Sequence, residues 1–181
     1  MSHRFTKEQG ALLVIDIQER LAAAMSPERL ERVINRAKAA VEGAKALGLP
    51  IAATEQYPKG LGPTLRVLAE AIPGFAPVEK TEFNAFLPSI RERLSPRPTV
   101  LVVGMETHVC VFQTVRALKD AGLSPYVAVD AVLSRNDADY QTGLSLCREA
   151  GAQLTTVEAA LFDAVGRAGT PEFKAISSAV K

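Results

Sequence analysis

Tryptophan is absent from this 181-residue chain, and cysteine and histidine occur only twice each. Two cysteines make a poor disulfide framework for a small secreted domain, and so few cysteines and histidines leave a zinc ion almost without ligands. No apolar run approaches the roughly 20 residues of a membrane span, and the first ten residues lack the apolar segment of a signal peptide. These absences favour a cytoplasmic protein with no membrane contact.

Neither sign of charge dominates, because 21 lysines and arginines stand against 20 aspartates and glutamates. The basic residues are spread along the chain and form no stripe, so the sequence gives no sign of a nucleic-acid-binding surface. No linker rich in glycine, serine or one kind of charge divides the chain, which is long enough for a sizeable core. We expect one domain over residues 1–181 and a small molecule as its partner.

The stretch 99–118 combines a buried strand with a helix. Residues 99–103 are aliphatic or β-branched, and the spacing of later apolar residues predicts a helix from about His108. Cys110 falls in the first turn of that helix, where unpaired N–H groups and the helix dipole favour a thiolate. The alternative is that Cys110 is a small buried hydrophobic residue, as we expect for Cys147.

Short apolar runs alternate with segments of helical periodicity along the rest of the chain. A capping box over residues 155–158 predicts the start of one helix, and prolines and glycines predict an irregular loop over residues 55–63. The expected strands are 11–15, 50–54, a short one at 78, 125–129 and 152–154. The expected helices are 27–47, 65–72, 83–94, 138–150, one beginning near 157 and one beginning at 171.

This alternation predicts an α/β fold, a three-layer α/β/α sandwich around a mainly parallel sheet. Asp16, Lys80 and Cys110 each come at or after the end of a predicted strand, and the carboxyl ends of parallel strands share one edge of the sheet. Alone, an aspartate there often caps a turn, and a lysine between glutamates is often a solvated charge. Together, a buried aspartate and lysine beside a thiol hold each other ionised and provide a proton acceptor for sulfur.

Three motifs carry a family resemblance: LLVIDIQ at 12–18, EKTEFNAF at 79–86 and VVGMETHVCV at 102–111. In order and spacing they resemble the isochorismatase-like cysteine hydrolases, the superfamily that includes nicotinamidase and N-carbamoylsarcosine amidohydrolase. The segments TEQYPKGLGPT at 54–64 and TTVEAALF at 155–162 look particularly like the isochorismatase domain-containing proteins. This branch has poorly defined substrates.

The resemblance implies a catalytic triad of Asp16, Lys80 and Cys110. Asp16 takes the thiol proton and later delivers it to the leaving amine, while Lys80 holds the charges in place and lowers the pKa of Cys110. Cys110 attacks a carbonyl carbon, and water then hydrolyses the acylated enzyme. The resemblance also implies a cis Met105–Glu106 peptide bond and an oxyanion hole formed by the backbone N–H groups of Glu106 and Cys110.

The departures from the family pattern narrow the expected reaction. Nicotinamidases bind a metal through histidines after their second strand, whereas residues 54–57 contain none, so we expect no metal and no nicotinamide substrate. Isochorismatases proper lack the cysteine, so Cys110 disfavours their vinyl-ether chemistry. The expected protein is a metal-independent hydrolase of a small amide C–N bond, without a cofactor, and a homo-oligomer by family resemblance.

Some residues have two interpretations each. Gln18, Glu55, Tyr57 and Phe83 are candidate substrate contacts, and each could equally be ordinary packing or, for Glu55, a solvated charge. His108 is two residues from Cys110 on the expected helix, so the two side chains should point apart, and we expect His108 at the pocket rim or at a subunit contact. The alternative function is a catalytically silent or redox-responsive protein that binds a metabolite or acts as a scaffold.

Overall fold

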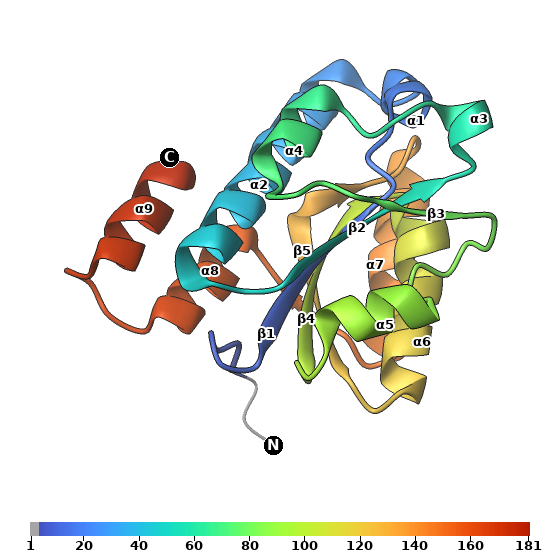
Figure 1. Ribbon diagram of the computed structural model, residues 1–181. Helices are drawn as coiled ribbons and strands as arrows, with labels where there is room; N and C mark the ends of the chain where they lie inside the picture. The colour runs from blue at the N-terminus through green and yellow to red at the C-terminus, as the bar shows by residue number, and fades with distance from the viewer. Residues whose placement is uncertain (1–3) are drawn as a thin grey trace.

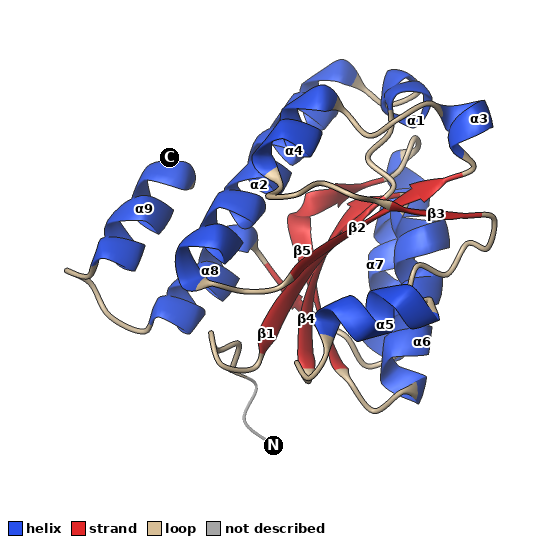
Figure 2. Ribbon diagram, viewed as in Figure 1, coloured by secondary structure: helices blue, strands red, loops and turns tan. Residues whose placement is uncertain are grey.

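The computed structural model describes residues 4–181, and its centre is a sheet of six parallel strands (Figures 1 and 2). The strand order is β3-β2-β1-β4-β5-β6, so the chain builds one half of the sheet outward from β1 and the other half outward from β4. The strands are β1 Gly10–Ile15, β2 Ile51–Gln56, β3 Val78–Lys80, β4 Thr99–Met105, β5 Ser124–Leu133 and β6 Gln153–Thr155.

Helices cover both faces of the sheet, which confirms the predicted α/β/α sandwich (Figure 2). One layer contains α1 Glu19–Ala23, α2 Pro27–Leu47, α4 Arg66–Ala71, α8 Val157–Val165 and α9 Pro171–Ala179. The other contains α5 Pro88–Leu94, the π-helix η1 Thr107–Val111, α6 Phe112–Asp120 and α7 Asp137–Glu149. The short helix α3 Pro58–Leu61 follows β2.

The central strands are apolar throughout because each of their faces meets a helical layer. Along β1, Leu12 and Val14 pack into the core on the α2 side, whereas Leu13 and Ile15 pack into the core on the α6 side. All four are at most 1% exposed. Cys147 belongs to the second core and is fully buried, which confirms its expected place.

Successive strands are added to one side of the sheet from β1 and to the other side from β4, so the direction of growth changes between these two strands. Open α/β sheets bind their ligands at such a point. Asp16 follows β1 here, and η1 follows β4 after one intervening residue. The two strands lie so close at this end that a Cβ on Gly104 would stand 2.0 Å from the carbonyl oxygen of Ile15. Gly104 also has a φ of 132°, so only glycine fits this position.

Two expected boundaries are wrong. Strand β5 does not stop at Val129 but continues to Leu133, through a register shift against β4 between Val102 and Gly104. Residues 83–87 are not helical: α5 begins at Pro88, whose fixed φ and missing N–H suit a first helical position.

Two local predictions near turns also differ from the structure. The loop 55–63 contains the helical turn α3, which follows the last residues of β2. The expected capping box over 155–158 is incomplete. Thr156 is the N-cap and accepts a bond from the N–H of Ala159, so Glu158 comes one position too early to close the box.

Candidate functional site

Asp16 stands at the carboxyl end of β1 with a backbone φ of 52°, which is uncommon for a residue other than glycine. The residue is fully buried. Its Oδ1 accepts a hydrogen bond of 2.7 Å from the hydroxyl of Thr54 on β2, so the carboxylate is oriented from the neighbouring strand. A strained backbone at a buried carboxylate is typical of functional sites.

Lys80, the last residue of β3, reaches the second carboxylate oxygen of Asp16. Its Nζ lies 2.7 Å from Asp16 Oδ2, and the side chains of both residues are fully buried. Further acceptors surround the ammonium group: Gln56 Oε1 at 2.6 Å and the carbonyl oxygens of Glu82 at 3.1 Å and Phe83 at 3.4 Å. The pair is therefore compensated in charge and well supplied with hydrogen bonds, as a buried ion pair must be.

Cys110 completes the cluster, with its Sγ 3.8 Å from Lys80 Nζ. The residue lies inside the π-helix η1 and not in the first turn of an α-helix, and it is 6% exposed. A Cβ on Gly143 of α7 would stand 2.7 Å from the backbone nitrogen of His108, so α7 packs directly on the backbone of η1. The structure thus brings Asp16, Lys80 and Cys110 together from three separate parts of the chain.

The pKa of Cys110 is raised to about 12, which is opposite to the expected direction. Burial of the thiol is the largest cause, and the negative charge of Asp16 is the second. The nearby Lys80 does favour the thiolate, as expected, but its effect is smaller than these two. The resting sulfur is therefore a thiol beside an ionised carboxylate, an arrangement in which Asp16 can accept the proton as sulfur attacks.

Glu106 lies between β4 and η1, and the Met105–Glu106 peptide bond is cis, as the resemblance implied. Its Oε1 accepts hydrogen bonds from the backbone N–H and the Nε of Arg135, at 3.1 and 3.0 Å. Its own backbone N–H has no acceptor within residues 4–181, although Glu106 is only 7% exposed. Buried N–H groups are rarely left without a partner, so this group is free to bind an oxygen of a ligand.

Gln18 and Glu55, two of the expected substrate contacts, bind the chain itself. The amide of Gln18 donates to the carbonyl oxygens of Gln56 and Gly62 and accepts from the N–H of Gln56. The carboxylate of Glu55 accepts from the N–H and the hydroxyl of Thr64. Both side chains hold the loop that follows β2, and their role toward a substrate stays a prediction.

The other two candidates, Tyr57 and Phe83, are 54% and 51% exposed. Both belong to segments that touch Lys80 through their backbones. The ring of His108 contacts two other side chains: its Nδ1 lies 3.0 Å from the hydroxyl of Ser134, and its Nε2 lies 4.0 Å from Asp139.

Sequence reasoning missed Thr54 and Gln56, which contact Asp16 and Lys80. Side chains two residues apart on a strand share a face, so Thr54 and Gln56 point one way and Glu55 between them points the other. This alternation indicates that Thr54 and Gln56 share one face, which becomes informative once β2 is known to lie beside β1. Arg135, the partner of Glu106, was also missed, because β5 continues beyond its expected end.

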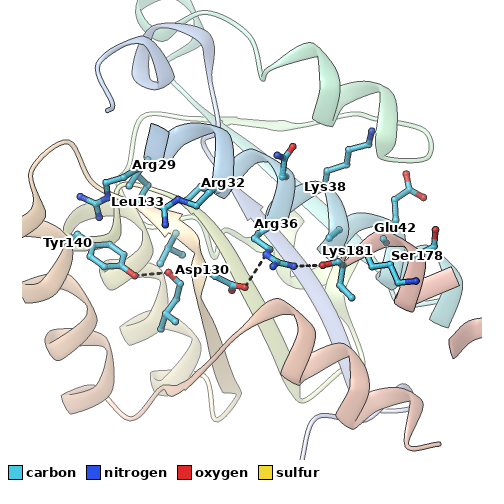
Figure 3. Close-up of a pocket in the computed structure, with 17 residues that line it drawn as sticks. Arg29, Arg32, Arg36, Lys38, Glu42, Asp130, Leu133, Tyr140, Ser178 and Lys181 are labelled. Carbon is cyan, nitrogen blue, oxygen red and sulfur yellow. Dashed lines mark hydrogen bonds and ion pairs between the residues drawn. The ribbon is translucent and has the colours of Figure 1, made fainter. Parts of the chain in front are cut away.

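A pocket of about 930 Å³ lies on the α2 side of the sheet, apart from this cluster (Figure 3). Its lining includes none of Asp16, Lys80 and Cys110. Figure 3 shows Arg36 between Asp130 and the end of α9, and each arginine of this face has an acidic partner: Arg29 with Asp137, Arg32 with Glu28 and Arg36 with Asp130. Asp130 also accepts a bond from the N–H of Val157, so it holds the structure together. The three arginines of this pocket are therefore held in ion pairs within the chain.

Two kinds of feature are absent from residues 4–181. The side chains of His, Cys, Asp and Glu form no group of three or more that could hold a metal ion. No helix in this range combines the length and the apolar character needed to cross a membrane.

The two buried thiols predict a loss of stability at alkaline pH. Burial raises the pKa of Cys147, like that of Cys110, from 9.0 to about 12. Above pH 9 these thiols lose their protons in the unfolded chain but keep them in the folded chain. The free energy of unfolding is therefore unaffected by the thiols below pH 9 and falls as the pH rises toward 12. At pH 10 each thiol should lower the free energy of unfolding by about 1.4 kcal/mol.

Urea unfolding at pH 8 and pH 10 measures this loss, and a Cys147→Ala variant isolates one thiol. The variant should lose about 1.4 kcal/mol less than the wild type between the two pH values. Equal losses in both proteins would contradict the raised pKa of Cys147.

The protein is an α/β protein with a buried Asp–Lys–Cys cluster at the carboxyl edge of its parallel sheet, and the comparisons with known proteins give its family. The model of the isochorismatase domain matches residues 10–159, and the chain belongs to this family of hydrolases. Isochorismatase domain-containing protein 2 of Bos taurus is 38% identical over 173 residues, which cover 94% of this chain and 82% of that protein.

Two further relatives show the breadth of the family. The secreted isochorismatase effector Isc1 of Phytophthora sojae is 35% identical, over 98% of this chain and 87% of that protein. The solved structure named MAR1 ribonuclease from Caenorhabditis elegans has a TM-score of 0.92 and 36% identity, and it covers 98% of this chain and 92% of that chain.

Proposed function

We propose that this protein hydrolyses a small amide C–N bond through a thioester on Cys110, without a metal. One observation carries the proposal: the ammonium group of Lys80 bonds Asp16 at 2.7 Å and lies 3.8 Å from the sulfur of Cys110, all at the ligand-binding edge of the sheet. A nucleophile, a base and a group that keeps the base ionised are the parts that covalent acyl transfer needs.

The reaction has two halves. Asp16 takes the proton from the thiol while Sγ of Cys110 attacks the carbonyl carbon, and the negative charge develops on the carbonyl oxygen. The N–H of Glu106 is free to bind that oxygen, and the N–H of Cys110 is the second proposed donor. Asp16 then protonates the leaving nitrogen, which departs as ammonia or an amine. Water, activated by the same carboxylate, cleaves the thioester and frees the acid and the thiol.

The same cluster favours a neutral amide over a phosphodiester as substrate, although the similar structure from Caenorhabditis elegans is named a ribonuclease. A phosphodiester is an anion and would have to approach the buried carboxylate of Asp16. The positive charge of Lys80 is already paired with that carboxylate, so the pair offers an incoming anion little net attraction. A neutral carbonyl meets no such repulsion.

Mass spectrometry of acid-quenched protein tests the thioester. After incubation with a panel of small primary amides, a substrate should leave an acyl group on the peptide that contains Cys110, while Cys147 stays unmodified as the internal control. Turnover with an adduct on another residue would contradict the assignment. The alternative, a binding or scaffold protein, would show metabolite binding that survives alkylation of Cys110 and no turnover of any amide.

A further inference from the structure

The element that carries Cys110 is short and depends on its surroundings. The π-helix η1 has five residues, and the N–H groups of Val109 and Val111 both donate to the carbonyl oxygen of Glu106, at 3.1 and 3.2 Å. A single helical turn forms too few bonds to hold its own geometry in water. The place of the Cys110 sulfur is therefore set by the contacts that η1 makes with the rest of the chain.

Two neighbouring residues directly after β5 bind the start of η1. Arg135 donates its backbone N–H and its Nε to Oε1 of Glu106, at 3.1 and 3.0 Å. The hydroxyl of Ser134 lies 3.0 Å from Nδ1 of His108. Glu106 and His108 are two residues apart in the chain, so η1 is held at two points. One bond would leave the turn free to rotate about it, whereas two bonds also fix its orientation.

The contact between His108 and Ser134 is shielded from solvent and does not depend on protonation. Ser134 is 1% exposed, and the side chain of His108 is 23% exposed. A hydroxyl both donates and accepts, so it can bond Nδ1 whether or not that nitrogen carries a proton. A Cβ on Gly143 would stand 2.8 Å from the carbonyl carbon of Thr107, so α7 also supports the backbone of η1.

Ser134, His108 and Asp139 do not form a second nucleophilic site. In a serine hydrolase, the histidine accepts the serine proton while a carboxylate bonds the other ring nitrogen. Here Nε2 of His108 lies 4.0 Å from Asp139, which is too far for a hydrogen bond, and the serine is buried. The arrangement suits holding a side chain in place and does not suit attack on a substrate.

We propose that His108 is a positioning residue for the hydrolysis. Through Ser134 it fixes η1, so that the sulfur of Cys110 and the backbone N–H of Glu106 face the same carbonyl group. This inference rests on the proposed function. Displacement of a reacting atom by about 1 Å can lower a rate by a factor on the order of 100. Loss of the bond should therefore slow the chemical step and leave binding of the substrate unchanged.

Substitutions test this role with any amide that the wild type hydrolyses. His108→Leu and Ser134→Ala should each lower kcat by about 10- to 100-fold, with KM within about twofold of the wild type. The double variant should lose no more than either single variant, because both changes remove the same bond. Unfolding midpoints establish that the variants are folded.

Two further variants separate positioning from other roles. His108→Asn should recover most of kcat, because its amide lies near the former place of Nδ1 and can bond Ser134, although it cannot transfer a proton. Asp139→Asn is the matched control within the same cluster and should keep kcat within about twofold, because Asp139 forms no hydrogen bond with His108. A loss in His108→Asn as large as in His108→Leu would show that His108 moves a proton and would overturn the positioning role.

Alkylation of Cys110 by iodoacetamide gives a readout that needs no substrate. Cys110 is 6% exposed, so a looser η1 should admit the reagent and speed its alkylation about tenfold in His108→Leu and Ser134→Ala, but not in His108→Asn. Peptide mass spectrometry measures the rate, with the buried Cys147 as the internal reference. An equal rise at Cys147 would indicate general loosening of the fold and would contradict a local role.

The two readouts separate this inference from the proposed function. If no amide is hydrolysed but alkylation of Cys110 alone becomes faster in His108→Leu, His108 holds η1 and the proposed hydrolysis fails. Wild-type kcat, or a wild-type alkylation rate at Cys110, in both His108→Leu and Ser134→Ala would overturn the positioning role.

Discussion

Replacing Cys110 by serine is expected to lower kcat for amide hydrolysis by about 10⁴-fold or more, with the fold unchanged. The sulfur is the proposed nucleophile, and it lies 3.8 Å from the ammonium group of Lys80. A serine hydroxyl would be a much weaker nucleophile in this buried place, because Asp16 would have to remove a proton from a far less acidic group. Steady-state assays with an amide that the wild type hydrolyses measure the loss.

Cys147→Ala is the matched control for this change, because the second thiol is fully buried in the core and takes no part in the cluster. It should keep kcat within about twofold of the wild type, although it will lower stability. Circular dichroism and the unfolding midpoint establish that both variants are folded. Wild-type turnover by Cys110→Ser would show that another group is the nucleophile.

The meeting of Asp16, Lys80 and Cys110 could be predicted because it depends on topology more than on packing. Asp16, Lys80 and Cys110 each come at or after the end of a short apolar run, and a parallel sheet gathers such ends along one edge. The strand order was not needed for that conclusion. Strands β3 and β4 are separated by two other strands, but the long side chain of Lys80 reaches across β2 to Asp16 at the end of β1, where Cys110 also lies within 3.8 Å of its ammonium group.

The hydrogen-bond partners of these residues could not be predicted in the same way. Thr54 and Gln56 contact the charged pair only because β2 lies between β1 and β3 in a particular register, which no local pattern sets. Arg135 reaches Glu106 because β5 shifts its register and continues past Asp130. Such contacts depend on how whole strands are paired.

The pKa of Cys110 shows a second limit of local reasoning. Its place near a helix start predicted a lowered pKa, but burial and the charge of Asp16 raise it. The desolvation of a thiol depends on everything packed around it, including residues far away in the chain. A helix terminus contributes only a small part of that balance.

Replacing Lys80 by methionine is expected to abolish hydrolysis and to destabilise the fold by about 3–5 kcal/mol. The change leaves the carboxylate of Asp16 fully buried without its positive partner, which is far more costly than losing a salt bridge on the surface. The negative charge that Asp16 needs to accept the proton of the thiol would then have no positive partner to stabilise it. Urea unfolding measures the stability, and ammonia release measures the activity.

An Asp16→Asn change added to Lys80→Met separates the two effects. The double variant has no buried charge at this place, so it should recover much of the lost stability, with a coupling free energy of at least about 1 kcal/mol between the two positions. Its activity should stay absent, because asparagine cannot act as a base. Arg66, whose ion pair with Glu70 lies on the surface, provides the comparison: Arg66→Met should cost less than about 1 kcal/mol and leave turnover unchanged. If Lys80→Met were no more damaging than Arg66→Met, the buried pair could not be what keeps Asp16 ionised.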